Sequence, residues 1–116
     1  MSKNKANLKS LVEAVEKIEN FVKEVNSADE FFQLTEKFDA VLMNFIVIGE
    51  MVDRLPENFK ENNSQVDWRK IKGFRNIIAH DYLGVDAEEV WQIITNHLSN
   101  LKIKIQEILN NLNLKT

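Results

Sequence analysis

The sequence predicts an all-α protein with the architecture of an antiparallel four-helix bundle. Three glycines and one proline among 116 residues are too few turn-forming residues for a sheet protein. Apolar residues recur at spacings of three and four, and capping motifs precede several of these stretches. Hydrophobic residues make up 44% of the chain, which is typical of a globular protein. At about 100 to 200 residues per domain, we expect one domain over residues 1–116.

The first two helices are predicted in the N-terminal half. Apolar residues at helical spacing between positions 8 and 25, separated by charged residues, indicate the first amphipathic helix. The sequence from Ser27 to Glu30 fits a capping box, so we expect the second helix to begin there. It should continue until Pro56, because proline cannot continue a helix. The polar segment 57–66 is expected to be a loop, with at most a short helical turn near residues 57–62.

Two further helices are predicted in the C-terminal half. Asp67 can cap a third helix over residues 68–80. Residues 82–85 would connect it to the last helix, for which Asp86 is the expected cap. From Ala87 onward, the apolar rhythm predicts one continuous helix of about 26 residues. Short connections between four helices favour the antiparallel arrangement.

Several classes of site and location are not expected. The chain has no cysteine, which excludes disulfides and thiolate metal sites. The longest apolar stretch is shorter than the roughly 18 residues that a membrane span requires, and the N-terminus lacks a secretory signal pattern, so we expect a cytoplasmic protein. No metal site is expected, because His97 lies about two helical turns beyond Glu88 and Glu89.

One basic segment contrasts with the net charge of −3. Between residues 68 and 79 there are four cations and no carboxylate, which could bind a phosphate backbone. The four cations are Arg69, Lys70, Lys72 and Arg75. His80 and Tyr82 follow, and a histidine beside an arginine suits phosphodiester cleavage because histidine exchanges protons near neutral pH.

Arg75 and His80 are about 140° apart around a continuous helix, so they do not share a face. Either the helix breaks near Ala79, or a second copy of the segment completes the site across a dimer axis. The sequence alone leaves both arrangements open.

Each of these residues also has an ordinary structural explanation. The lysines could be a solvated helix face, and Arg75 could form an ion pair with Glu50 or Asp53. His80 could interact with the carbonyl groups at the end of its helix, and the Tyr82 hydroxyl could lie in water. His97 falls on the apolar stripe of the last helix, which favours a packed or interface histidine.

The segment 75–82 reads R-x4-H-x-Y and resembles the motif of HepT-like HEPN proteins. The polar Asn76 after the arginine also fits that pattern. Further similarity lies in the segment Ile48-Gly49-Glu50, in the lead-in from Trp68 to Gly73, and in the opening of the last helix over residues 85–91. The similarity spans roughly residues 45–109.

The resemblance implies a homodimeric, metal-independent endoribonuclease that needs no cofactor. Such proteins are toxins whose antitoxin partner is a minimal nucleotidyltransferase. By this resemblance, Arg75, His80 and Tyr82 are catalytic, with His80 as general acid or base and Arg75 stabilising charge on the phosphorus. Asn76 and Glu50 would support them, and Arg69, Lys70 and Lys72 would bind RNA. Tyr82 is also where the partner would attach AMP and so inhibit cleavage.

Two alternatives keep the helical fold without an enzyme. In the first, the chain is a non-catalytic helical partner of a nucleotidyltransferase, and Arg75 and His80 hold a nucleotide or a structural ion pair. In the second, it is a dimeric scaffold whose apolar stripes serve only oligomerisation.

Overall fold

The computed structural model describes residues 2–114, and this part of the chain contains helices and connections but no strand. The all-α prediction is confirmed. Residues 1, 115 and 116 of the predicted domain lie outside the described residues. The elements are α1 (Lys3–Val22), α2 (Ala28–Gln33), α3 (Thr35–Asp53), α4 (Glu57–Glu61), α5 (Trp68–His80), the 3-10 turn η1 (Tyr82–Gly84), α6 (Ala87–Asn96) and α7 (Leu98–Leu114).

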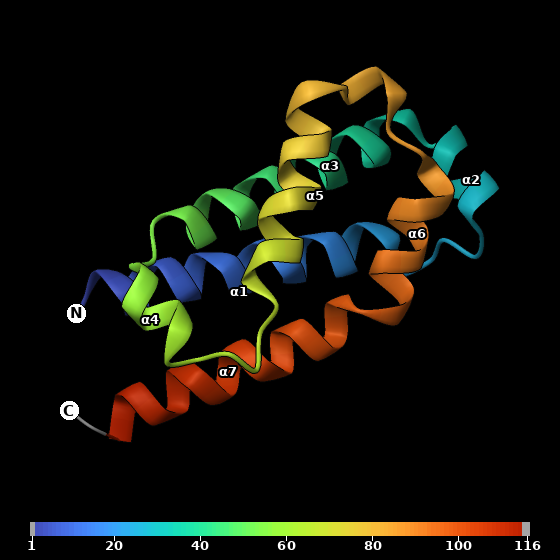
Figure 1. The fold of residues 1–116 in the computed structure, drawn as a ribbon. Helices are drawn as coiled ribbons and strands as arrows, with labels where there is room; N and C mark the ends of the chain where they lie inside the picture. The colour runs from blue at the N-terminus through green and yellow to red at the C-terminus, as the bar shows by residue number, and fades with distance from the viewer. Residues whose placement is uncertain (1, 115–116) are drawn as a thin grey trace.

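The long helices alternate in direction, as an antiparallel bundle requires (Figure 1). α1 packs against α3 on one side and against α7 on the other, while α5 lies on α3. At one end of the molecule, the short α2 packs against α6. The core is formed by fully buried aliphatic side chains of α1, α3 and α7, among them Leu8, Leu11, Ile18, Leu42, Ile105 and Ile108.

The predicted second helix is broken, which corrects the expectation of one continuous helix up to Pro56. Leu34 has φ −86° and ψ 72°, so it separates α2 from α3. The break lets α2 turn toward α6, where the buried Phe31 ring lies 5.0 Å from Phe38 and 5.7 Å from Trp91. Tertiary packing of these aromatic rings explains a break that helical spacing does not reveal.

The predicted last helix is also two helices. It breaks at His97, which has φ −126° and ψ −28°. Val90 and Ile94 of α6 are buried at the α2 end, whereas α7 runs along α1. One straight helix cannot cover both surfaces. The Thr95 hydroxyl donates to the Trp91 carbonyl, 2.9 Å away, a contact that often accompanies a bend.

The expected helix caps are present. The Ser27 hydroxyl accepts a hydrogen bond from the Glu30 N–H, and the Asp67 carboxylate accepts one from the Lys70 N–H, both at 3.1 Å. Asp86 accepts from the Glu88 N–H at 3.0 Å. The short turn expected near residues 57–62 is α4.

The first helix ends three residues before Val25, whose side chain is nevertheless buried.

Within residues 2–114, no helix combines the length and the apolar composition needed to cross a membrane.

Candidate functional site

Arg75 lies where α5 comes closest to α3. A Cβ atom at Gly49 would overlap the Cβ and Cγ atoms of Arg75, so only glycine leaves room for the arginine side chain there. The Phe74 ring, next in sequence, contacts the Phe45 ring of α3 edge-on at 5.1 Å. Gly49 and this aromatic pair therefore fix α5 on α3.

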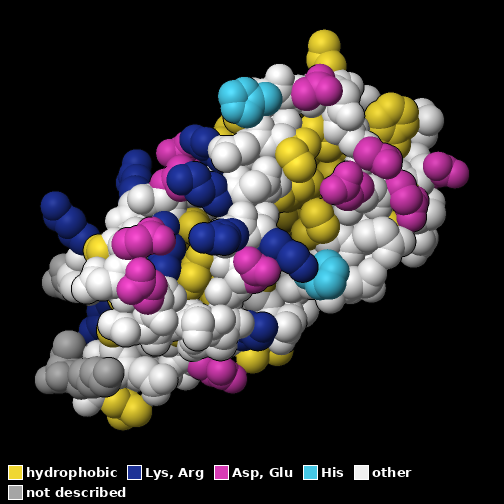
Figure 2. Space-filling model, in the orientation of Figure 1, with side chains coloured by type: hydrophobic (Ala, Val, Ile, Leu, Met, Phe, Trp, Pro, Cys, Tyr) yellow, Lys and Arg dark blue, Asp and Glu magenta, His cyan; other side chains and the backbone are white. Residues whose placement is uncertain are grey.

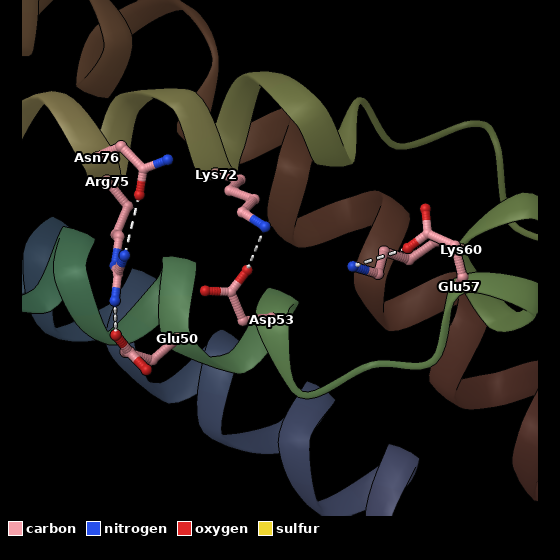
Figure 3. A network of polar contacts seen from close by, with 7 residues as sticks. All are labelled: Glu50, Asp53, Glu57, Lys60, Lys72, Arg75 and Asn76. Atoms are coloured by element: carbon pink, nitrogen blue, oxygen red, sulfur yellow. Dashed lines mark hydrogen bonds and ion pairs between the residues drawn. The ribbon is translucent and has the colours of Figure 1, made fainter.

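The Arg75 guanidinium group is held on two sides (Figure 3). Its Nη2 donates to the Glu50 carboxylate in an ion pair, and its Nη1 donates to the Asn76 Oδ1 atom at 2.9 Å. Its Nε is buried and has no hydrogen-bond partner within residues 2–114. The side chain is 24% exposed. Each Nη atom keeps a second N–H that Glu50 and Asn76 do not use.

The other cations of the basic segment differ in their surroundings. Lys72 forms an ion pair with Asp53 of α3 at 3.4 Å, one helical turn from the pair of Arg75 and Glu50. Arg69 and Lys70 are exposed and have no ion pair among residues 2–114. Figure 2 shows Lys and Arg side chains along α5 and toward α7, with Asp and Glu side chains among them. The patch is less positive than the sequence predicts, because α3 supplies carboxylates to it.

His80 is the last residue of α5, and the helix continues through Ala79. The helix therefore ends where the sequence predicts and does not break near Ala79, one of the two arrangements left open, and Arg75 and His80 point in different directions around it. The His80 side chain is exposed and makes no hydrogen bond within residues 2–114. The structure does not bring Arg75 and His80 together within one chain, so only the second arrangement, a site completed by another copy, keeps both in one cleft.

Tyr82 follows in a turn that Asp81 and Gly84 shape. The Asp81 carboxylate accepts a hydrogen bond from the Gly84 N–H at 3.2 Å. A Cβ atom at position 84 would overlap that carboxylate, so the Asp81 side chain would have to move if the glycine were replaced. An aspartate followed three residues later by glycine is a common turn signal, and it was available in the sequence. The turn directs Tyr82 toward α3.

The Tyr82 hydroxyl donates a hydrogen bond to the Asp39 Oδ1 atom at 2.8 Å. The alternative in which the hydroxyl lies free in water therefore does not hold. Partial burial, the hydrogen bond to Asp39 and the charge of that carboxylate raise the pKa of Tyr82 to about 12. Asp39 was not a candidate residue, because it lies 43 positions away and no local pattern links the two.

A groove of about 410 Å³ separates α5 from α7. Its apolar walls include Phe45, Ile48, Ile71, Phe74, Leu98 and Leu101. Lys70 and Lys104 line it from opposite helices, together with His97. Figure 2 shows apolar side chains at the surface beside α5, on the side toward α6. His97 is exposed at the break between α6 and α7, so of the two roles expected for it, packed or interface, it is not packed within the chain.

No group of three or more His, Cys, Asp and Glu side chains within residues 2–114 is arranged to hold a metal ion. Glu88, Glu89 and His97 are all exposed. The candidate residues are instead an arginine, a histidine and a tyrosine, residue types whose side chains can bind anions or transfer protons.

The phenol of Tyr82 can be titrated directly, because it is the only tyrosine in the chain. We expect ultraviolet absorbance to report a pKa of about 12 in the native protein. Asp39→Ala removes the hydrogen bond and the charge, so it should lower this pKa toward 10. Because the folded pKa is raised, the stabilisation is complete below pH 10 and is lost as pH rises toward 12. Glu36→Gln, on the same helix, is the control. An equal pKa in wild type and Asp39→Ala would contradict the contact.

The chain is similar to known proteins over most of its described length. The family described as Ribonuclease HepT-like matches residues 11–108. A protein of Methanocaldococcus jannaschii named "Gamma-glutamylcyclotransferase and putative RNase" is 33% identical over 107 residues, covering 90% of this chain and 47% of that protein. A "Putative RNase" of Caldanaerobacter subterraneus is 36% identical over 70 residues, covering 60% of this chain and 62% of that protein.

A "Probable ribonuclease HepT" of Thermococcus cleftensis is 30% identical over 101 residues, which cover 87% of this chain and 91% of that protein. The chain thus spans less than two thirds of the first two relatives and most of the third. No solved structure matches. Since the family match includes both α3 and the segment 75–82, the chain belongs to the HepT-like ribonuclease family.

Proposed function

We propose that this chain is an endoribonuclease that cleaves RNA by attack of the ribose 2'-hydroxyl, with Arg75, His80 and Tyr82 at the reacting phosphate. The main support is that a single 13-residue helix holds a positioned guanidinium group and ends in an exposed imidazole, and the turn after it holds a phenol. These are a stabiliser of negative charge and a proton-transfer group for phosphodiester chemistry.

In this mechanism His80 moves the proton of the 2'-hydroxyl or of the leaving oxygen. Arg75 stabilises the charge that develops on the phosphoryl oxygens, and its ion pair with Glu50 and hydrogen bond to Asn76 keep the guanidinium group in place. Tyr82 orients the phosphate. Attack by the neighbouring hydroxyl leaves a 2',3'-cyclic phosphate, a reaction that acid–base groups and a cation are sufficient to promote.

RNA binding is assigned to Arg69, Lys70 and Lys72. Arg69 and Lys70 offer exposed charges, and Lys72 exchanges Asp53 for a phosphate when RNA binds. Lys104 of α7 lines the groove opposite Lys70 and extends this surface beyond α5, which the sequence alone does not indicate.

We assign the active form to a homodimer. Arg75 and His80 face different ways in one chain, so two copies of the segment are needed to form one cleft. Apolar surface beside the motif supports such a contact: Ile77 is 53% exposed and Leu83 is 96% exposed. Burying these side chains between two copies would favour association.

The same cleft provides the proposed regulation. In this scheme the chain is the toxin of a toxin–antitoxin pair, acts in the cytoplasm, and has a minimal nucleotidyltransferase as its antitoxin. Transfer of AMP to Tyr82 places a negative charge and an adenosine beside the basic segment, which would exclude RNA by charge and by bulk.

A second candidate is a non-catalytic partner of the nucleotidyltransferase. The ion pair between Arg75 and Glu50 favours it, because an arginine that already has a carboxylate partner can be purely structural. The two candidates differ in one property, since only the first requires His80 for RNA cleavage.

His80→Ala should lower the rate of RNA cleavage by about 10² to 10⁴, the usual contribution of a general acid or base. The measurement is release of fragments with 2',3'-cyclic phosphate ends by the purified protein, alongside growth of cells that express it. His97→Ala, which changes the only other histidine, is the matched control and should cleave normally. Equal cleavage by wild type and His80→Ala would exclude His80 as the catalytic group, and the absence of cleavage by the wild type would exclude the ribonuclease assignment.

Light scattering should give about 27 kDa at micromolar concentration, twice the 13.5 kDa of one chain. Replacing the exposed Ile77 by aspartate should shift the mass toward one chain and reduce cleavage in parallel. A mass of one chain with full cleavage activity would refute the composite cleft.

Incubation with the cognate nucleotidyltransferase, ATP and Mg²⁺ should raise the mass of the chain by one or more AMP units and abolish RNA cleavage. Tyr82→Phe should prevent the addition, because the chain has no other tyrosine. If the adduct formed equally on Tyr82→Phe, or if an active partner gave no adduct, inhibition would have to come from binding of the partner over the cleft.

A further inference from the structure

Tyr82 and Asp39 form a contact that the RNA-cleavage mechanism does not use. The hydrogen bond joins η1 to α3 at 2.8 Å, although the two residues are 43 positions apart in the chain. Both residues are exposed, with Tyr82 at 36%, so an enzyme that modifies the hydroxyl can reach it where it lies. The pair is therefore presented at the surface rather than sealed in the core.

Asp39 is the carboxylate that the described residues place at this hydroxyl. The nearest acidic residue in sequence, Asp81, directs its carboxylate to the Gly84 N–H instead. Within residues 2–114, the Tyr82 hydroxyl makes no other hydrogen bond. The proton of the phenol thus points at a single acceptor, the Oδ1 atom of Asp39.

We propose that Asp39 accepts the proton of the Tyr82 hydroxyl when that oxygen attacks the α-phosphorus of a nucleoside triphosphate. The inference rests on the proposed function, because it concerns the nucleotidyl transfer to Tyr82. It adds that the modified chain supplies its own general base.

In this step a bond forms between the Tyr82 phenolic oxygen and the α-phosphorus, and the bond from that phosphorus to the pyrophosphate oxygen breaks. The phenolic proton passes to the Asp39 carboxylate and then to water, and pyrophosphate leaves. An aspartate that accepts a hydroxyl proton is an established arrangement in phosphoryl transfer.

A base is needed because the phenol stays protonated at neutral pH. The same hydrogen bond that holds the proton on Tyr82 before the reaction provides the path along which the proton leaves when the oxygen bonds to phosphorus. The hydrogen bond from Tyr82 to Asp39 thus both stabilises the protonated phenol before the reaction and places the acceptor for its proton.

Two substitutions separate proton transfer from positioning. Asp39→Asn keeps an oxygen that accepts the hydrogen bond, but an amide does not take up the proton. Asp39→Ala removes both properties. Glu36→Gln changes an exposed carboxylate on the same helix and serves as the matched control. Circular dichroism and thermal unfolding verify that each variant is folded.

The readout is the initial rate of AMP incorporation by the cognate nucleotidyltransferase with ATP and Mg²⁺, followed by mass spectrometry of the full chain. We expect Asp39→Asn and Asp39→Ala to lose at least about 100-fold in the maximal rate, with an unchanged dependence on ATP concentration. Glu36→Gln should match wild type.

The outcomes distinguish the inference from the function on which it rests. A wild-type rate for Asp39→Asn with a slow Asp39→Ala would show that Asp39 only positions Tyr82, and would overturn the inference. Wild-type rates for both would overturn it as well. In either case the modification of Tyr82 itself would stand. If the wild-type chain took no AMP from an active partner, the proposed regulation would fail first, and the inference with it.

Discussion

The close approach of α5 to α3 at Gly49 is the contact on which the site depends. It lets the Arg75 side chain pass over α3 and pair with Glu50, and the pair of Lys72 and Asp53 repeats this one turn away. Such partly exposed ion pairs contribute about 0 to 1 kcal/mol each. Burying Trp68 and Ile78 contributes about 1.5 to 3 kcal/mol for each side chain. Apolar burial therefore holds α5 in place, and the ion pairs set which residues face each other.

α3 also determines the electrostatics of the motif. Its carboxylates contact side chains of residues 72–82 at three points, with Asp39 at Tyr82, Glu50 at Arg75 and Asp53 at Lys72. The order is reversed along the two segments because they run antiparallel (Figure 1). Two of the four cations between residues 68 and 79 are consequently paired within the chain. In the proposed function, RNA phosphates must compete with these carboxylates for the two paired cations. A polyanion that offers several phosphates at once therefore binds this surface better than a single small anion does.

Local sequence signals predicted the capped helix starts correctly. The helix breaks that they did not predict depend on tertiary contacts. Ser27, Asp67 and Asp86 cap helices as expected, because a cap involves residues only two or three positions apart. The breaks at Leu34 and His97 were missed because the apolar spacing continues through both. They arise where α2 and α6 pack together, a contact between distant segments. For the same reason the sequence supplied Arg75, His80 and Tyr82 as candidates but not Asp39.

Two carboxylates of α3 contact the two ends of the motif, and they lie far apart along the helix. Asp39 and Glu50 are 11 residues apart, about 17 Å at a rise of 1.5 Å per residue. One carboxylate meets the phenol and the other meets the guanidinium group, so the two ends of the motif are held independently by one rigid helix. A change at Tyr82 can therefore alter the surface near the 3-10 turn without loosening Arg75. In the proposed scheme the AMP group consequently inhibits by occupying the cleft, while the arrangement of Arg75, Asn76 and Glu50 stays intact.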